Sequence, residues 1–563
     1  MAENRKKAIL CALNAKYVHT ALSVRYIKAY AEKHCQNVNC TILEETINTK
    51  SSVVSDMILK LKPDIVAFSC YIWNINNVIE ICARIKEQSP KIIIILGGPE
   101  VTYNAEYYLN NTHIDYVQCG EGERPMSVLL DCIALSEAIP DDIGVCYKKD
   151  EKIHISVPYC EKNLSLIESP YTDEYTETVK GRIAYIETTR GCPFSCTFCL
   201  SGGQKGVRCF DDKYVKESII KLWKSGAHTI KFIDRTFNAN KNHANSIISF
   251  ILENKESMPQ NVCFHFEVAA DILSDSTMEL LLSAPDGLFQ IEAGLQSFNH
   301  ETLEAVSRKT DNDKVCRNVK ALAERGNMHI HIDLIAGLPY ENLESFKDSF
   351  NRAYSVGAHM LQLGFLKLLY GSTLRDQAES FGFEYSNIAP YEIMSTNWLS
   401  REDMLVIKDA EDANEKISNS GRFKDTLKYI LEVSGKTPFD LFCGFGKKHS
   451  MSLDEYTQLV FEYFSGLPGV NKARLRDIMC CDRLRTNRSG KLPECLKIKD
   501  SLLSKVTSEL QNNPETKSKA GIKRAVCILY TENTAVYVDY DEKKANNAEY
   551  KLNYVNLDDL FAE

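Results

Sequence analysis

The 563-residue sequence predicts an α/β protein built from three parts. Two series of short apolar runs, each followed by a helix-like pattern, predict parallel strands joined by helices. The length also exceeds that of one compact domain. We expect a first domain at residues 1–145, a linker at 146–180, a second domain at 181–400 and a mainly helical α+β accessory domain at 401–563.

The composition is typical of a soluble globular protein, with 44% hydrophobic and 25% charged residues. A net charge of −9 gives no electrostatic reason to expect nucleic acid or an anionic membrane as a partner. No apolar run reaches the length of a membrane span, and Met1–Lys7 lacks the core of a signal peptide. We therefore expect a protein of the reducing cytoplasm, in which the 20 cysteines are not disulfide-bonded by default.

Five strand patterns alternate with helical patterns in the first domain. This alternation predicts a doubly wound, Rossmann-like parallel sheet, whose ligands bind beyond the carboxyl ends of the strands. The strands are expected at Ala8–Leu13, Cys40–Glu44, Ile65–Cys70, Ile92–Leu96 and Tyr116–Cys119. The helices are expected at Ala21–Lys33, Val54–Lys60, Asn77–Gln88 and Pro125–Cys132.

Glycines follow two of these strands, in Gly97-Gly98-Pro99-Glu100 and in Gly120-Glu121-Gly122. Paired glycines after a buried strand let a flat, bulky ligand approach the backbone. No G-x-G-x-x-G follows the first strand, so the sequence does not favour a dinucleotide.

The second part opens on Cys192-Pro193-Phe194-Ser195-Cys196-Thr197-Phe198-Cys199, directly after a strand pattern at Ile183–Thr188. Thiolates at this C-x3-C-x2-C spacing suit an iron–sulfur cluster or zinc. A cluster with three protein ligands keeps one iron open, whereas structural zinc prefers four ligands and no fourth lies close by in the sequence. Free cysteines that happen to be close are the alternative.

This segment resembles the cluster motif of the radical S-adenosylmethionine (SAM) superfamily, including Phe198 directly before the last cysteine. The resemblance implies that Cys192, Cys196 and Cys199 bind a [4Fe–4S] cluster whose open iron takes the amino and carboxylate groups of SAM. One electron, from a donor of the flavodoxin or ferredoxin type, would cleave SAM to a 5′-deoxyadenosyl radical. Such a cluster is sensitive to oxygen, which favours an anaerobic setting.

Further strand patterns, separated by helices, follow the cysteine segment. They are expected at Thr229–Phe232, Cys263–Val268, Leu288–Glu292, His329–Ile335 and Met360–Phe365. With the first strand they form six units, which resemble the partial (β/α)6 barrel of radical SAM enzymes. Barrel chemistry takes place at the carboxyl ends of the strands, so the residues there are the candidates for SAM binding.

The second and third strands supply two acidic candidates. Asp234 stands where many radical SAM proteins hold the methionine amino group on a Gly-Gly-Glu turn. The glycines are missing, so backbone carbonyls and Asp234 are the expected acceptors. An ion pair of Asp234 with Arg235 or Lys231 is the alternative. Glu267 lies at the end of the third strand.

The fourth strand ends in Glu292-Ala293-Gly294-Leu295-Gln296-Ser297. This run resembles the E-x-G-x-Q-S segment of cobalamin-dependent and methylthio-transferring radical SAM enzymes, in which the polar residues line the SAM ribose and carboxylate. Arg308 resembles an arginine near that carboxylate, although a surface role is equally open. Gly337, after the fifth strand, would let the adenine pack against the backbone.

The first domain, taken with this core, resembles the cobalamin-binding domains that precede radical SAM cores. The two glycine segments carry the resemblance and are therefore implied to line the cobalamin. Other cobalamin proteins supply a histidine to cobalt from a D-x-H-x-x-G segment, which is absent here. His19 lacks the flanking residues, so a loop histidine bonded to backbone is favoured over cobalt ligation.

The C-terminal part resembles an accessory domain of family members whose substrates are mostly unassigned. Cys480, Cys481 and Cys495 are interpreted as structural thiols rather than a second cluster. The polar stretch Ser508–Lys523 is expected to be a surface loop. Helices are expected at Arg401–Lys416, Lys424–Glu432 and Leu453–Phe464, and a hairpin at Ala525–Tyr530 and Ala535–Tyr540.

These features predict a cobalamin-dependent radical SAM enzyme that transfers methyl to an unactivated carbon of an unknown small molecule or peptide. A radical cyclase or rearrangement enzyme with the same cofactors is the alternative, which the product mass would distinguish. A non-catalytic cobalamin or redox sensor would not need the complete SAM site. A methylthiotransferase would need three further cysteines in the first domain, and the cysteines there do not follow that pattern.

Overall fold

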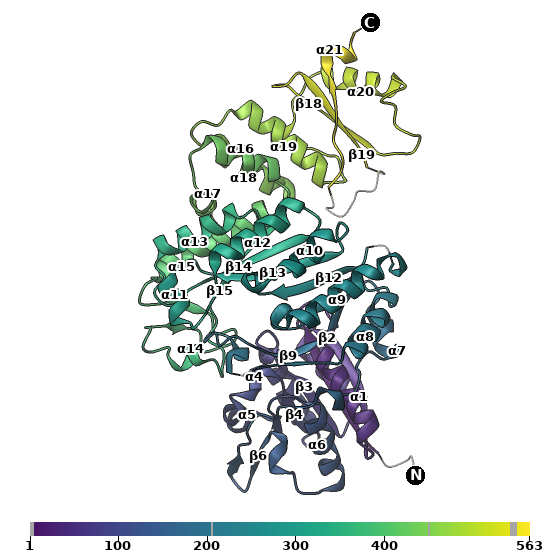
Figure 1. Cartoon of the computed structure of the whole chain (residues 1–563), viewed down its shortest axis with the longest axis vertical. Helices are drawn as coiled ribbons and strands as arrows, with labels where there is room; N and C mark the ends of the chain where they lie inside the picture. The colour runs from purple at the N-terminus through teal and green to yellow at the C-terminus, as the bar shows by residue number, and fades with distance from the viewer. Residues whose placement is uncertain (1–4, 204–205, 260, 449–450, 541–548, 563) are drawn as a thin grey trace.

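The computed structural model describes residues 5–203, 206–259, 261–448, 451–540 and 549–562. Three parts follow one another along the long axis of the molecule, with the first domain at one end and the C-terminal sheet at the other (Figure 1). The start of the segment in which we expected no signal-peptide core, residues 1–4, lies outside the described residues.

The first domain is built on a seven-stranded sheet in the order β2-β1-β3-β4-β5-β6-β7. Strands β1 to β5 pair in parallel, and β6 and β7 are antiparallel. The strands are β1 (Lys6–Asn14), β2 (Val38–Thr46), β3 (Ile65–Ser69), β4 (Ile93–Gly97), β5 (Tyr116–Gln118), β6 (Val145–Lys149) and β7 (Lys152–His154).

Helices cover both faces of this sheet because the central strands are apolar on both sides. Along β1, Ile9 and Cys11 join one buried cluster and Ala8 and Leu10 join the other. Residues of α2 and α3 pack in the first cluster, and residues of α1 and α6 pack in the second. The doubly wound sheet is therefore confirmed. Its helices are α1 (Leu22–His34), α2 (Ser51–Lys60), α3 (Ile75–Gln88), α4 (Pro99–Thr102), α5 (Ala105–Asn111) and α6 (Glu123–Leu135).

The antiparallel edge of the sheet was not predicted. β7 is exposed or half-buried along its length, and β6 is buried only at Val145 and Cys146, so neither has the apolar run of a central strand. The sheet extends to His154 because these strands pair beside β5. The domain boundaries at residues 145, 180 and 400 stay predictions.

The second sheet has six parallel strands in the order β15-β14-β13-β12-β11-β8, which agrees with the predicted partial barrel. The strands are β8 (Ile183–Ile186), β11 (Thr229–Phe232), β12 (Cys263–Val268), β13 (Phe289–Gln296), β14 (His329–Ala336) and β15 (Met360–Phe365). Helices α8 (Asp212–Lys224), α9 (Lys241–Glu253), α10 (Asp275–Ser283), α12 (Asn312–Arg325) and α13 (Leu343–Ser355) alternate with them.

The two faces of this sheet differ in chemistry. On β13 every second residue is fully buried, beginning with Phe289, and the residues between them are half-buried. Residues paired across parallel strands share a face. The registers therefore place Lys231, His265, Gln290, Glu292 and His331 together on the less buried face, which we call the inner face.

Directly after β8, the chain forms an antiparallel hairpin of β9 (Thr189–Cys192) and β10 (Gly206–Cys209). The hairpin carries the first cysteine of the predicted cluster motif. In the view of Figure 1, β9 lies between the first domain and the second sheet.

Helices and a small sheet form the C-terminal part. Phe439 on α17 packs edge-to-face on Phe350 of α13, with ring centroids 5.4 Å apart, so this part shares its core with the second sheet. The helices are α15 (Arg401–Ala413), α16 (Lys424–Val433), α17 (Pro438–Phe445), α18 (Leu453–Ser465), α19 (Lys472–Thr486) and α20 (Leu502–Asn512). The sheet is β18 (Arg524–Leu529), β19 (Thr534–Asp539) and β20 (Asn553–Asn556).

We did not predict helices α17, α19 and α20, and the reason is visible for the last two. Ser508–Asn512, expected to be loop, is the last part of α20, which is helical because Val506 and Leu510 are buried on one side. α19 shows no clear apolar stripe because its buried residues include charged ones, such as Arg476 and Asp477, which pair at 2.8 Å. Among the described residues, no helix is both long enough and apolar enough to cross a membrane.

Candidate functional site

The three motif cysteines lie on one loop at the carboxyl end of the second sheet. Cys192 is the last residue of β9, and Cys196 and Cys199 follow it. The backbone N–H of Cys199 donates to the carbonyl of Cys196 at 3.1 Å, and that of Thr197 donates to the carbonyl of Val306 at 3.0 Å. One hydrogen bond within the loop and one to the segment after β13 therefore fix the conformation of the loop.

A guanidinium lies beside the most buried of these thiols. Arg308 Nη1 is 3.8 Å from Cys196 Sγ. Burial raises the pKa of the Cys196 thiol, and Arg308 opposes that rise. Because thiolates, not thiols, bind metals, a positive charge at this position suits an iron–sulfur cluster. Arg308 therefore lies in the site and not on the surface, half-buried beside the loop.

At the end of β13, the side chain of Gln296 folds back over Gly294. The E-x-G-x-Q-S segment therefore has glycine two residues before the glutamine. The Gln296 amide lies over Gly294, where a Cβ would be 2.2 Å from Gln296 Nε2. Arg308 donates to the carbonyl of Gly294. Gln296 Oε1 and Arg308 Nε are buried without a hydrogen-bond partner among the described residues. Unpaired buried polar atoms are costly, so this strand end fits a polar ligand such as SAM.

Asp333 on β14 adds an acidic group that we did not predict. It pairs with Gly294 across the sheet, its Oδ1 has no partner among the described residues, and burial raises its pKa to about 8. The signal for it in the sequence was the alternation of polar residues along β14, at His329, His331 and Asp333. This carboxyl group therefore belongs with Gln296 at the SAM candidate site.

The predicted residues Glu267 and Glu292 are neighbours across β12 and β13 on the inner face, and both contact Lys231 of β11. Lys231 Nζ is 3.4 Å from a carboxylate oxygen of each. The hydrogen bond with His265, at 3.1 Å, and the charge of Lys231 lower the pKa of Glu292 to about 2. Ligand atoms of His265, Glu267 and Glu292 lie within 4.8 Å of one another. Because Lys231 already supplies a positive charge to both carboxylates, we do not assign a metal ion to this cluster.

Three other predicted residues contact the protein itself. Ser297 is fully buried and donates to Glu341 Oε1 at 2.6 Å, so it fixes the turn after β13. Phe198 is partly buried against the core. Gly337 has a φ of +92°, and a Cβ there would lie 3.3 Å from Ile393 Cγ2.

Asp234 is buried, and it pairs with neither Arg235 nor Lys231 among the contacts of the described residues. Its carboxylate accepts hydrogen bonds from Thr188 Oγ1 at 2.8 Å and from Thr189 Oγ1 at 2.5 Å. Burial raises its pKa to about 7. Asp234 therefore ties the end of β11 to the start of the cysteine hairpin. A contact with the SAM amino group stays a prediction.

The glycine segments of the first domain lie at the carboxyl ends of β4 and β5, as expected. Gly98 has a φ of +117°, and a Cβ there would lie 2.5 Å from the carbonyl oxygen of Cys70. At Gly120, a Cβ would lie 2.2 Å from the carbonyl oxygen of Tyr159, and at Gly122, 3.0 Å from Gln118 Oε1. Close approach of the protein's own chain therefore requires glycine at Gly98 and Gly120, with or without a ligand. Pro99 is the first residue of α4.

This difference between neighbouring glycines yields a prediction for cofactor-free protein. Gly98→Ala should lower the free energy of unfolding by about 1–3 kcal/mol because alanine is strained at positive φ and meets Cys70. Gly97→Ala should change it by less than about 0.5 kcal/mol because its Cβ would meet nothing closer than 3.6 Å. Thermal unfolding of both variants measures this. If Gly98→Ala were as stable as Gly97→Ala, the loop would have to relax around Cys70.

The two predicted glutamates at this edge reach beyond the first domain. Glu100 is buried and accepts hydrogen bonds from Tyr108, at 3.1 Å, and from Tyr391. Glu121 forms ion pairs with Arg190, at 3.0 Å, and with Arg208, at 2.5 Å. Both glutamates thus connect the cobalamin candidate edge to the rest of the chain.

One further contact joins the same edge to the second sheet. His19 Nδ1 lies 2.6 Å from the hydroxyl of Tyr185 on β8, so this histidine contacts a side chain rather than backbone.

In the loop after β3, Tyr71 and Trp73 stack with ring centroids 4.3 Å apart, and Trp73 remains 46% exposed. An exposed aromatic stack is a suitable surface for a flat ligand.

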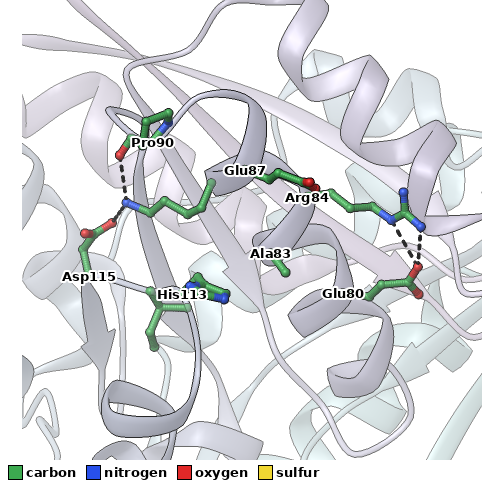
Figure 2. Close-up of a pocket in the computed structure, with 9 residues that line it drawn as sticks. Glu80, Ala83, Arg84, Glu87, Pro90, His113 and Asp115 are labelled. Atoms are coloured by element: carbon green, nitrogen blue, oxygen red, sulfur yellow. Dashed lines mark hydrogen bonds and ion pairs between the residues drawn. The ribbon is translucent and has the colours of Figure 1, made fainter.

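A separate surface hollow lies at the opposite edge of the first sheet (Figure 2). Its lining includes Pro90, His113 and Asp115, which precede β4 and β5. Lys86 pairs with Asp115 at 2.7 Å, and Arg84 pairs with Glu80 at 3.1 Å. This hollow lies away from the carboxyl ends, where sheets of this type bind ligands.

Three family models match the chain in the order of its three parts. A B12-binding domain model matches residues 9–130, a radical SAM superfamily model matches residues 186–353, and a protein of unknown function model (DUF4080) matches residues 379–551. The chain belongs to the cobalamin-dependent radical SAM family. The matches imply a [4Fe–4S] cluster and SAM for the second part and cobalamin for the first.

Curated relatives of this radical SAM protein are distant. It is 25% identical over 381 residues to the cobalamin-dependent radical SAM methyltransferase TokK of Streptomyces tokunonensis, which covers 64% of this chain and 54% of TokK. It is 25% identical over 378 residues to the anaerobic magnesium-protoporphyrin IX monomethyl ester cyclase of Rubrivivax gelatinosus, covering 62% and 65%. The chain thus spans about half the length of TokK and under two thirds of the cyclase.

Solved structures show the same fold. The cobalamin-dependent SAM radical enzyme OxsB, with aqua-cobalamin and SAM bound, superposes with a TM-score of 0.59 at 14% sequence identity. The match covers 84% of this chain and 78% of OxsB.

Proposed function

We propose that this chain is a cobalamin-dependent radical SAM methyltransferase that acts on an unactivated carbon of a polar substrate. The observation that carries the proposal is the position of the cysteine loop. It lies at the carboxyl end of the second sheet, on a hairpin that is ion-paired through Arg190 to the glycine segment of the first domain. One loop can then serve both cofactor sites.

When bound, the cluster supplies the electron that cleaves SAM, and cobalamin supplies a carrier for the methyl group. The chain's own residues would bind and orient SAM and the substrate. Gln296 and Asp333 offer unpaired polar atoms to SAM, and Arg308 keeps positive charge beside the loop. Lys231, Glu267 and Glu292 form the polar wall against which a substrate would lie.

The relatives support methyl transfer but leave a second chemistry open. TokK is a methyltransferase, whereas the Rubrivivax protein is a cyclase of similar identity over a similar share of this chain. A charged inner face, with Lys231 between two carboxylates, suits a polar substrate better than an apolar macrocycle. This feature favours the methyltransferase over a macrocycle-directed cyclase.

Isotope transfer distinguishes these two reactions. Anaerobically reconstituted protein would be incubated with methyl-deuterated SAM, a flavodoxin- or ferredoxin-type donor and a metabolite extract from a deletion strain. We expect one metabolite to gain a deuterated methyl group, measured by mass spectrometry. A metabolite that loses hydrogen without gaining label would identify a cyclase. No change in any metabolite, with SAM intact, would contradict both and favour a sensor.

A further inference from the structure

The cysteine hairpin presents a guanidinium and a cluster ligand on the same face. On β9, Arg190 and Cys192 are two residues apart, so their side chains point the same way. Across the hairpin, Arg190 pairs with Arg208 and Cys192 with Gly206. Contacts that hold Arg190 therefore also hold the strand of Cys192, whose local geometry is set by its pairing across the hairpin.

Arg190 is held by carboxylates from both parts of the chain. Its Nη1 lies 3.0 Å from Glu121, its Nη2 contacts Glu123, and its Nε and Nη2 lie 3.1 and 3.0 Å from the two oxygens of Glu187. Glu121 and Glu123 belong to the first domain and flank Gly122, whereas Glu187 follows β8. The side chains of Arg190 and Glu123 are only 9% and 7% exposed, so water screens these contacts poorly.

Arg208 completes the cluster from the second strand of the hairpin. It places both terminal nitrogens on Glu121 and donates to the carbonyl of Glu161. Burial raises the pKa of the Glu121 carboxyl, but the hydrogen bonds from Arg208 and the charge of Arg190 outweigh burial and leave it below its ordinary value. Glu121, predicted to line cobalamin, thus has its carboxylate occupied by the hairpin.

We propose that Arg190 is a positioning residue, which holds the strand of Cys192 at one fixed separation from the Gly120–Glu123 segment. The inference rests on the proposed function, because that separation matters only if the cluster site and the cobalamin site act together. Lysine at this position would keep the charge but lose the planar fork that reaches three carboxylates at once.

The first measurement uses hydrogen exchange in cofactor-free protein. In Arg190→Gln, segments 118–123 and 189–196 should exchange about tenfold faster or more. Glu123→Gln removes a contact from the other side of the interface and should act in the same direction. Arg190→Lys should give an intermediate rate. Arg25→Gln is the matched control because Arg25 pairs with Glu44 at 2.7 Å with side chains 7% and 13% exposed, and its side-chain hydrogen bonds among the described residues do not reach β9 or β10.

The second measurement uses protein loaded with iron, SAM and cobalamin. In Arg190→Gln, reductive SAM cleavage should stay near the wild-type rate, whereas transfer of the SAM methyl group to cob(I)alamin should fall about tenfold. In Arg25→Gln, methyl transfer should not fall relative to reductive SAM cleavage. If wild-type protein binds no cobalamin, the proposed function fails, while hydrogen exchange still tests Arg190. Unchanged exchange in Arg190→Gln and Glu123→Gln, or equal effects from Arg25→Gln, would overturn the proposal.

Discussion

Replacement of Cys192, Cys196 and Cys199 by alanine should abolish iron binding and reductive SAM cleavage together. Wild-type protein reconstituted without oxygen should hold about four irons per chain. The triple variant should hold almost none because no other described thiols lie in the same loop. Iron analysis and the visible absorption of the cluster measure the result directly.

Cys209→Ala is the matched control for this loss. Cys209 lies on β10 of the same hairpin and is half-buried, but it lies outside the C-x3-C-x2-C motif. We expect this variant to keep its full iron content. Retention of four irons by the triple variant, or their loss in Cys209→Ala, would show that the ligands were wrongly assigned.

Gln296→Ala should weaken SAM binding by about ten- to a hundredfold, without changing iron content. The side chain ends in a buried oxygen without a partner among the described residues, beside Arg308 and Gly294. A hydrogen bond to a charged ligand contributes about 1.5–3 kcal/mol, which corresponds to that range of affinity. Anaerobic equilibrium binding of SAM to the reconstituted protein measures the change.

Gln290→Ala provides the comparison on the same strand face. Gln290 lies six residues earlier on β13, where its amide nitrogen contacts His331 at 2.9 Å. Its removal should leave SAM affinity within about twofold, because it lies at the amino end of the strand. Equal SAM affinity in Gln296→Ala and wild type would mean that Gln296 only packs over Gly294.

Local sequence patterns predicted most of the fold. The expected bounds of β11, β12 and β15 match the structure. Buried and half-buried residues alternate regularly along β11, whereas β12 is identified by its run of buried residues from Phe264 to Phe266. Residues that share a strand face could be anticipated in the same way. The alternation of His329, His331 and Asp333 was such a signal, and we overlooked it.

Contacts between distant segments could not be predicted. The hydrogen bond of Tyr391 to Glu100 joins residues 291 positions apart, and no local pattern specifies it. Likewise, Glu121 was interpreted as a cofactor residue from its glycine neighbours, whereas its carboxylate is paired to the hairpin. Gly98 and Gly120 are also required by neighbouring backbone, so glycine at these positions does not by itself indicate a ligand, and their contact with cobalamin stays a prediction.

The formation of 5′-deoxyadenosine from SAM tests the central claim most directly. Wild-type protein, reconstituted without oxygen and supplied with dithionite, should produce it, as measured by liquid chromatography and mass spectrometry. Production should stop when the reductant is omitted or the three motif cysteines are replaced. A preparation with a full cluster and bound SAM that yields no 5′-deoxyadenosine, or that yields it equally without the cysteines, would contradict the assignment as a radical SAM enzyme.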